Sequence, residues 1–127
     1  MQEIFNNIKK YKKKIGLIDT NNKQYSYKKI LEEAEKIGQN VLKNSLIVLI
    51  SSNTFESVVG YIAFVKNNNI LLLLDESADR KFVKKMIHKY QPSYIYKPKN
   101  YLFDKVTYKK IVNSQNYELL RTRFKLK

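Results

Sequence analysis

Three polar side chains that could bind a ligand stand together at Ser51, Ser52 and Asn53. They follow the apolar run 46–50, which is typical of a buried strand, and they precede a segment with helical periodicity. In an open α/β sheet, ligands bind where strands end and helices begin. Hydroxyl and amide groups at such a place are also common helix caps, because they accept hydrogen bonds from first-turn amides. We favour the capped turn and keep the three residues as a candidate ligand-side loop.

The sequence offers few other groups for catalysis. It has no cysteine, so there is no thiolate nucleophile, disulfide framework or cysteine-based metal site. The one histidine, His88, falls among lysines on the polar side of a predicted helix, and we interpret it as an exposed helix residue. Neither the GxGxxG nor the GxxxxGK[ST] pattern for nucleotide phosphates occurs. We therefore assign no catalytic, cofactor-binding or metal-binding residue.

The net charge of +14 raises the question of a nucleic-acid partner. Only three of the 25 basic residues are arginine, whereas proteins that read bases and phosphates rely on the planar guanidinium group. The lysines are also spread over the whole chain rather than gathered in one stripe. The charge therefore predicts solubility and nonspecific attraction, with no specific nucleic-acid partner.

Membrane and targeting signals are missing from the sequence. No apolar run approaches the roughly 18 residues that a membrane span requires. The N-terminal stretch lacks the apolar segment of a secretory signal. We expect a cytoplasmic protein without a membrane span.

The apolar pattern predicts one α/β domain over residues 1–127. We expect βαβ units with a mainly parallel sheet flanked by helices, plus short antiparallel strands near both ends. Residues 1–14 are predicted to form an N-terminal helix, 15–97 the α/β core and 98–127 a strand-rich extension. Within the core, Asn21 and Asn22 mark a hairpin turn between two short extended pieces.

Three helix starts are predicted from capping residues. Ser26 caps a helix that runs to about residue 42, and Asn53 with Glu56 three positions on resembles a capping box. Ser77 caps a third helix, with Asp79 in its first turn. The buried stripe of this third helix is predicted to comprise Phe82, Val83, Met86, Ile87 and Tyr90.

The centre of the core is a strand–helix–strand unit. The runs 46–50 and 70–74 are predicted to be strands buried on both faces, joined by a helix over 53–66. A further short strand is expected at 93–96, before Lys97. Beyond residue 100, aromatic and basic residues alternate with polar ones, which predicts strands whose aromatic side chains pack on a solvent-facing ribbon.

Taken in order, the segments between residues 16 and 97 resemble the opening of the AMP-dependent synthetase and ligase family. This family includes acyl-CoA synthetases, luciferases and the adenylation domains of peptide synthetases. The stretch YSYKKIL at 25–31 is similar to the family's TYxEL-like helix start. Residues 46–51, 53–66 and 70–75 then resemble its strand, its "pNs.efv...lA.lkaG" helix and its strand ending "vPld".

Three places in this resemblance involve a change of residue type. At the helix start, Lys28 and Lys29 replace the family's usual acidic character. Asn68 or Asn69 stands where the family has glycine before the third strand. Asparagine tolerates the left-handed conformation that the glycine would adopt. Leu73 stands where the family has proline before the acidic residue.

The resemblance implies the N-terminal subdomain of an adenylate-forming ligase, with ATP and Mg as cofactors of the parent family. The family's phosphate loop and its catalytic lysine lie further along than the matched segments. The chain ends about where the strand leading into that loop would begin. We therefore expect an acyl-CoA synthetase-like scaffold, natural or excised, that lacks the ATP-binding loop, binds no cofactor alone and is inactive alone.

Two kinds of partner follow from the resemblance. One is the remainder of the ligase, its C-terminal parts; the other is a second copy, through an exposed sheet edge. The alternative to the ligase reading is a stand-alone small α/β binding or interaction module with a basic surface. The acid substrate and the acceptor, CoA or a carrier protein, both stay open.

Overall fold

A computed structural model describes residues 15–18, 24–101 and 108–122. The predicted N-terminal helix and the turn at Asn21 and Asn22 lie outside the described residues. The elements are β1 (Ile15–Ile18), β2 (Gln24–Ser26), α2 (Tyr27–Gly38), β3 (Leu46–Ser51), α3 (Phe55–Lys66), β4 (Ile70–Asp75), α4 (Arg80–Tyr90), β5 (Tyr94–Pro98), β6 (Tyr108–Asn113) and β7 (Tyr117–Thr122).

The main sheet has five strands in the order β4-β3-β5-β7-β6. Strand β3 pairs in parallel with both β4 and β5, and β7 pairs antiparallel with β5 and β6. The short strands β1 and β2 form a separate antiparallel pair. The predicted α/β class is confirmed: parallel strands make the core, and antiparallel strands lie near both ends of the chain.

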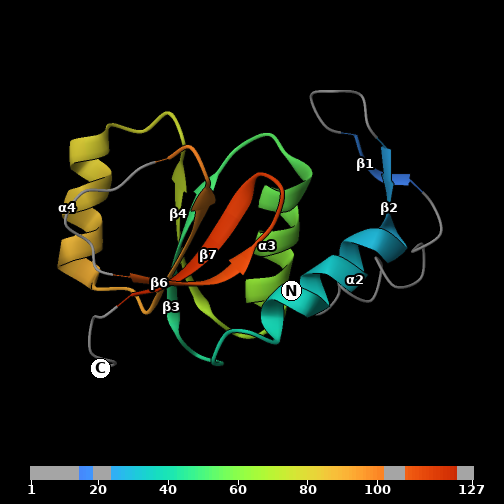
Figure 1. Cartoon of the computed structure of the whole chain (residues 1–127), viewed down its shortest axis with the longest axis horizontal. Coiled ribbons are helices and arrows are strands. Elements are labelled where there is room, and N and C mark those ends of the chain that lie inside the picture. Colours follow the sequence, from blue (N-terminus) through green and yellow to red (C-terminus); the bar gives the residue numbers. More distant parts are fainter. Residues whose placement is uncertain (1–14, 19–23, 102–107, 123–127) are drawn as a thin grey trace.

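Helices cover both faces of this sheet. Figure 1 shows α4 on one side and α3, followed by α2, on the other. Successive side chains of β3 point to opposite faces of the sheet. Ile47 and Leu49 pack with α2 and α3, whereas Val48 and Ile50 pack with α4. This arrangement follows from right-handed crossovers that run from β3 outward to β4 and then back across to β5.

The contact between α3 and the sheet depends on one glycine. The Tyr96 ring lies against Gly60, where an added Cβ would stand 2.4 Å from Tyr96 Cε2. The same ring meets Phe64 edge-on, with centroids 5.5 Å apart, and lies 4.7 Å from the Tyr117 ring. Glycine therefore sets how closely α3 approaches the centre of the sheet.

The helix boundaries confirm one predicted cap and correct the rest. Ser26 caps α2, accepting a hydrogen bond from the Lys29 amide at 3.1 Å. The helix ends at Gly38 rather than near residue 42, although Val41 beyond it is still buried. Apolar spacing therefore continued past the end of the helix, because the following turn packs on the same core.

The caps of α3 and α4 lie one or two residues later than predicted. Thr54 caps α3 in place of Asn53, and Asp79 caps α4 in place of Ser77. Ser77 instead donates its backbone amide to Asp75 at 2.9 Å. In both stretches more than one nearby side chain can cap the helix, and competing local hydrogen bonds decide which one does.

Two predicted burial patterns are wrong. Strand β4 is an edge strand, with Ile70 63% and Leu73 52% exposed, and is not buried on both faces. On α4, Val83 and Ile87 are buried, but Phe82 and Tyr90 from the predicted stripe are exposed. His88, on the same helix, is exposed as predicted.

The strands beyond residue 100 are confirmed, but their environment differs from the prediction. Strand β7 lies inside the sheet, between β5 and β6. Tyr117 is only 1% exposed, so its ring belongs to the core and not to a solvent-facing ribbon. The predicted left-handed asparagine is Asn68, whose φ is 62°. None of the helices described is long and apolar enough to cross a membrane.

Candidate functional site

A cleft of about 480 Å³ opens at the carboxyl ends of the parallel strands. The chain leaves β3 toward α3 on one face of the sheet, whereas it leaves β4 toward α4 on the other face. In the order β4-β3-β5 the strand order reverses between β3 and β5, and the segments that follow these two strands line the cleft; open α/β folds bind ligands at such a point. The lining residues are Ser52, Asn53, Thr54, Glu76, Pro98, Lys99, Asn100, Gln115, Asn116 and Tyr117.

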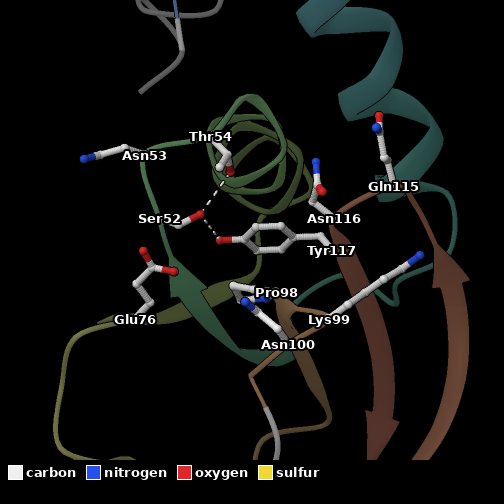
Figure 2. Close-up of a pocket in the computed structure, with 10 residues that line it drawn as sticks. All are labelled: Ser52, Asn53, Thr54, Glu76, Pro98, Lys99, Asn100, Gln115, Asn116 and Tyr117. Atoms are coloured by element: carbon white, nitrogen blue, oxygen red, sulfur yellow. Dashed lines mark hydrogen bonds between the residues drawn. The ribbon is translucent and has the colours of Figure 1, made fainter. Parts of the chain in front are cut away.

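A chain of hydroxyl groups forms the floor of this cleft. Tyr117 donates its hydroxyl proton to the Ile50 carbonyl at 2.7 Å. Its oxygen lies 2.8 Å from Ser52 Oγ, which in turn lies 3.0 Å from Thr54 Oγ1 (Figure 2). Because the tyrosine proton is already used in the bond to Ile50, Ser52 donates to Tyr117 and Thr54 donates to Ser52. The Thr54 oxygen also accepts the Ser57 amide, which closes the chain at the helix start.

This arrangement does not activate Ser52 as a nucleophile. A catalytic serine needs a general base that takes its proton. Here the proton points to Tyr117, and burial raises the pKa of that phenol, which keeps it protonated. Among the described residues, the groups that Ser52 Oγ contacts are other hydroxyls. The hydroxyls hold the strand-to-helix turn in place, as a capped turn does.

The three residues of the candidate loop therefore have different places. Ser52 lies on the floor of the cleft, inside the hydroxyl chain. Asn53 lines the cleft, and Figure 2 shows its amide pointing away from that chain. Ser51 does not line it, because its hydroxyl donates to the Leu74 carbonyl of the neighbouring strand at 3.4 Å.

Glu56 fixes the opposite wall of the cleft. Its carboxylate accepts the backbone amide of Asn116 at 3.1 and 3.2 Å, the amide of Tyr117 at 3.0 Å and the hydroxyl of Ser114. It thus ties the first turn of α3 to the turn between β6 and β7. Local pattern predicted only a capping role for Glu56, because its contact with the turn about 60 residues away has no local sequence signal.

The remaining lining groups are mostly neutral hydrogen-bonding side chains. Lys99 and Glu76 are the charged members, and the backbone amide of Lys99 donates to the Asn116 carbonyl at 2.9 Å. Such a lining suits a small polar ligand. The described residues contain no group of three or more histidine, aspartate or glutamate side chains that could hold a metal ion.

A buried ion pair lies behind the cleft, on the α4 face. Lys97 is 2% exposed, and its ammonium group lies 2.8 Å from Glu118 on the neighbouring strand. Lys110 reaches the other oxygen of Glu118 at 3.0 Å. Burial opposes ionisation of Glu118, but the hydrogen bonds from the two lysines outweigh it and hold the pKa of this carboxyl below its ordinary value. Together, Lys97, Glu118 and Lys110 join β5, β7 and β6.

Comparison with known proteins identifies the fold. No family model matches the sequence, and no curated protein matches it. Among solved structures, the luciferase-like enzyme from the nonluminescent mealworm Zophobas morio is 16% identical, with a TM-score of 0.69 over 77% of this chain and 25% of that chain. The Klebsiella oxytoca NpsA N-terminal subdomain, in complex with 3-hydroxybenzoyl-AMSN, is 12% identical, with a TM-score of 0.63 over 73% of this chain and 25% of that chain.

A third similar structure is apo MatB from Rhodopseudomonas palustris, 15% identical with a TM-score of 0.57 over 65% of this chain and 17% of that chain. All three are AMP-dependent ligases, so the resemblance seen in the sequence is confirmed at the level of the fold. The chain spans about a quarter or less of the length of these structures. Even the NpsA N-terminal subdomain is about four times the matched segment.

Proposed function

We propose that this chain is the N-terminal portion of an AMP-forming acid ligase and serves there as structural scaffold. The observation that supports the proposal best is the fold itself, which superposes on three such ligases with TM-scores of 0.57 to 0.69. The sequence resemblance between residues 16 and 97 points to the same family. An acyl-CoA synthetase-like enzyme in the cytoplasm is the form we propose.

The scaffold role rests on the chemistry of the cleft. Transfer of an adenylyl group requires cationic and backbone groups preorganised around the phosphates. In the described residues the cleft offers one lysine, Lys99, and its hydroxyls are occupied by one another. We therefore propose that the chain binds neither ATP nor Mg by itself, and that residues 1–127 act as one domain.

In the complete enzyme the cleft would face the remaining parts of the ligase. Its floor and far wall are fixed by Ser52, Tyr117 and Glu56, so the loops at the carboxyl ends of the strands keep their shape without a ligand. Asn53 and Lys99 are the lining groups best placed to meet a polar ligand or partner segment. We propose the C-terminal parts of the ligase as the partner at this end of the sheet.

The direct test is ATP–pyrophosphate exchange with the purified chain and a panel of fatty, aromatic and amino acids. We expect no exchange above that of a mock preparation from cells without the gene. Acid-dependent exchange that rises with chain concentration would contradict the scaffold role.

The alternative function, a stand-alone binding module with a basic surface, is supported by the +14 charge and the open polar cleft. The genomic sequence after codon 127 separates the two. A continuation, in frame or frameshifted, into a strand followed by a Ser/Thr/Gly-rich loop supports the ligase. A stop codon followed by a complete unrelated gene supports the module.

A further inference from the structure

The main sheet has two edge strands that differ in how they meet solvent. Strand β6 carries exposed Lys109 and Lys110 and is interrupted by a register shift between Lys110 and Val112. Strand β4 has no charged residue before Asp75 and keeps an unbroken register against β3 over all of its residues. Lysines and bulges are the usual means of preventing an edge from pairing. Edge β4 lacks both.

The free hydrogen-bonding groups of β4 can be assigned residue by residue. The amide of Ile70 donates to the Ser45 carbonyl at 3.0 Å, and the amide of Glu76 donates to the Ser51 carbonyl at 2.9 Å. Because the direction of the backbone groups alternates along a strand, the even-numbered residues between them also point to β3. The backbone groups of residues 71, 73 and 75 therefore point outward, a set that is symmetric about Leu73. Of these groups, the Asp75 carbonyl also accepts the Ala78 amide at 3.0 Å.

Apolar side chains flank this edge on both faces. Leu73 is 52% exposed on the face that α3 covers. On the other face, Phe82 and Tyr90 of α4 are 46% and 45% exposed. Arg80 of the same helix lies 3.5 Å from the centre of the Tyr101 ring, and Phe82 lies on the side of α4 opposite Arg80. Apolar surface around an unpaired edge marks an interaction site.

Charge is distributed unequally along the same edge. Asp75, Glu76 and Asp79 lie together at the carboxyl end of β4. Lys43 and Lys66 lie at its amino end, where they and Glu35 line one hollow with the start of the turn into β4, so this end carries a net positive charge. If β4 of a second copy paired antiparallel with this edge, the acidic end of each strand would lie beside the basic end of the other. A second copy is therefore complementary to the edge, despite the net charge of +14.

We infer that two copies of this chain associate through β4, antiparallel, around a two-fold axis at Leu73. Leu73 then pairs with its own equivalent, and residues 71 and 75 exchange hydrogen bonds with 75 and 71 of the second copy. The axis is perpendicular to the sheet, so both α4 helices lie on one face and their exposed aromatic residues flank the junction. This inference does not depend on the proposed ligase role.

The first test is sedimentation equilibrium of the whole chain and two matched variants. Leu73→Lys places two ammonium groups at the axis, whereas Leu42→Lys changes an equally exposed leucine (52%) in the loop before β3. We expect a dimer for the native chain and for Leu42→Lys, and we expect Leu73→Lys to weaken the association by more than about 100-fold. Circular dichroism melting checks that each variant folds.

Monomeric native chain up to about 0.5 mM would overturn the inference, since a pairing weaker than that has no role at ordinary concentrations. Equal weakening by Leu73→Lys and Leu42→Lys would also overturn it, because the effect would then be general charge repulsion.

The second test uses the absence of native cysteine. A short bifunctional thiol reagent should join Leu73→Cys into a covalent dimer, because the two-fold axis places residue 73 opposite itself about 5.5 Å away between Cα atoms. Lys109→Cys on edge β6 is the control and should remain monomeric. Joining of the β6 variant, or equal joining of both, would place the contact elsewhere and contradict the inference.

Discussion

Strands β4 and β6 end the same sheet, yet the two sides of the molecule are built differently. On the β6 side, Glu56 ties the hairpin turn to α3, and Glu118 forms ion pairs with Lys97 and Lys110 that join three strands. On the β4 side the large apolar residues Ile70, Leu73, Phe82 and Tyr90 are exposed, and the strand has no register shift. The two edges differ in that β6 carries exposed lysines and a register shift, whereas β4 carries neither.

The β6 side depends most on its buried ion pair. Glu118→Leu leaves the Lys97 ammonium buried without its carboxylate, and we expect the free energy of unfolding to fall by about 3–5 kcal/mol. Urea denaturation measures the loss. The double variant Lys97→Met with Glu118→Leu should recover most of it, because no charge is left buried. A double variant as unstable as the single one would show that packing, not charge, governs the site.

The link between α3 and the hairpin turn comes next. Glu56→Ala removes a carboxylate that accepts the amides of Asn116 and Tyr117, and we expect a loss of about 2–3 kcal/mol. Hydrogen exchange at these two amides should become fast. Glu32→Ala, which breaks only an exposed pair with Lys28 at 4.0 Å, is the control and should cost at most about 0.5 kcal/mol. Unchanged exchange in the Glu56 variant would contradict the link.

The glycine under Tyr96 should matter slightly less. Gly60→Ala places a methyl group within 2.4 Å of the ring, and we expect a loss of about 2 kcal/mol from the resulting repacking. Gly38→Ala is the matched control, because its Cβ would meet nothing closer than 3.8 Å and alanine favours helix by about 1 kcal/mol. Thermal melting compares the two. Opposite signs are expected, and equal destabilisation would contradict the packing described here.

The smallest effect is the pH dependence of the Glu118 contribution. The pKa of Glu118 is lower in the folded chain than in the unfolded chain, so its stabilisation is complete above the ordinary glutamate value of about 4.3. The contribution is lost as the pH falls through the lower folded pKa. Glu118→Gln should therefore flatten the fall in unfolding free energy below about pH 4.3. If the fall in unfolding free energy at low pH is unchanged in this variant, other carboxyl groups cause it.

Much of the fold could be predicted from local pattern. The strand–helix–strand unit, the Ser26 cap and the left-handed asparagine at position 68 all follow from residues close in sequence. The resemblance to adenylate-forming ligases rested on the same segments. Local pattern was less decisive where several capping residues stand in a row, as at Asn53 and Thr54.

The missed features depend on which strands become neighbours. A run of leucines predicts a strand buried on both faces. Only the strand order shows that, within the part of the chain that the structure describes, no strand pairs with the outer side of β4. The pairing of Lys97 with Glu118 requires the β5–β7 register, and the role of Glu56 requires the hairpin turn to fold back on α3. Of the candidate ligand-side loop, Ser52 and Asn53 reach the cleft but Ser51 does not.

Native-state hydrogen exchange at several protein concentrations tests the contrast between the two edges most directly. The outward amides of β4, at Leu71 and Leu73, should exchange fast in dilute solution and become protected as the concentration rises. The amides on the free side of β6 should exchange fast at every concentration. Fast exchange of the β4 amides throughout, or protection that appears on β6 instead, would contradict the account.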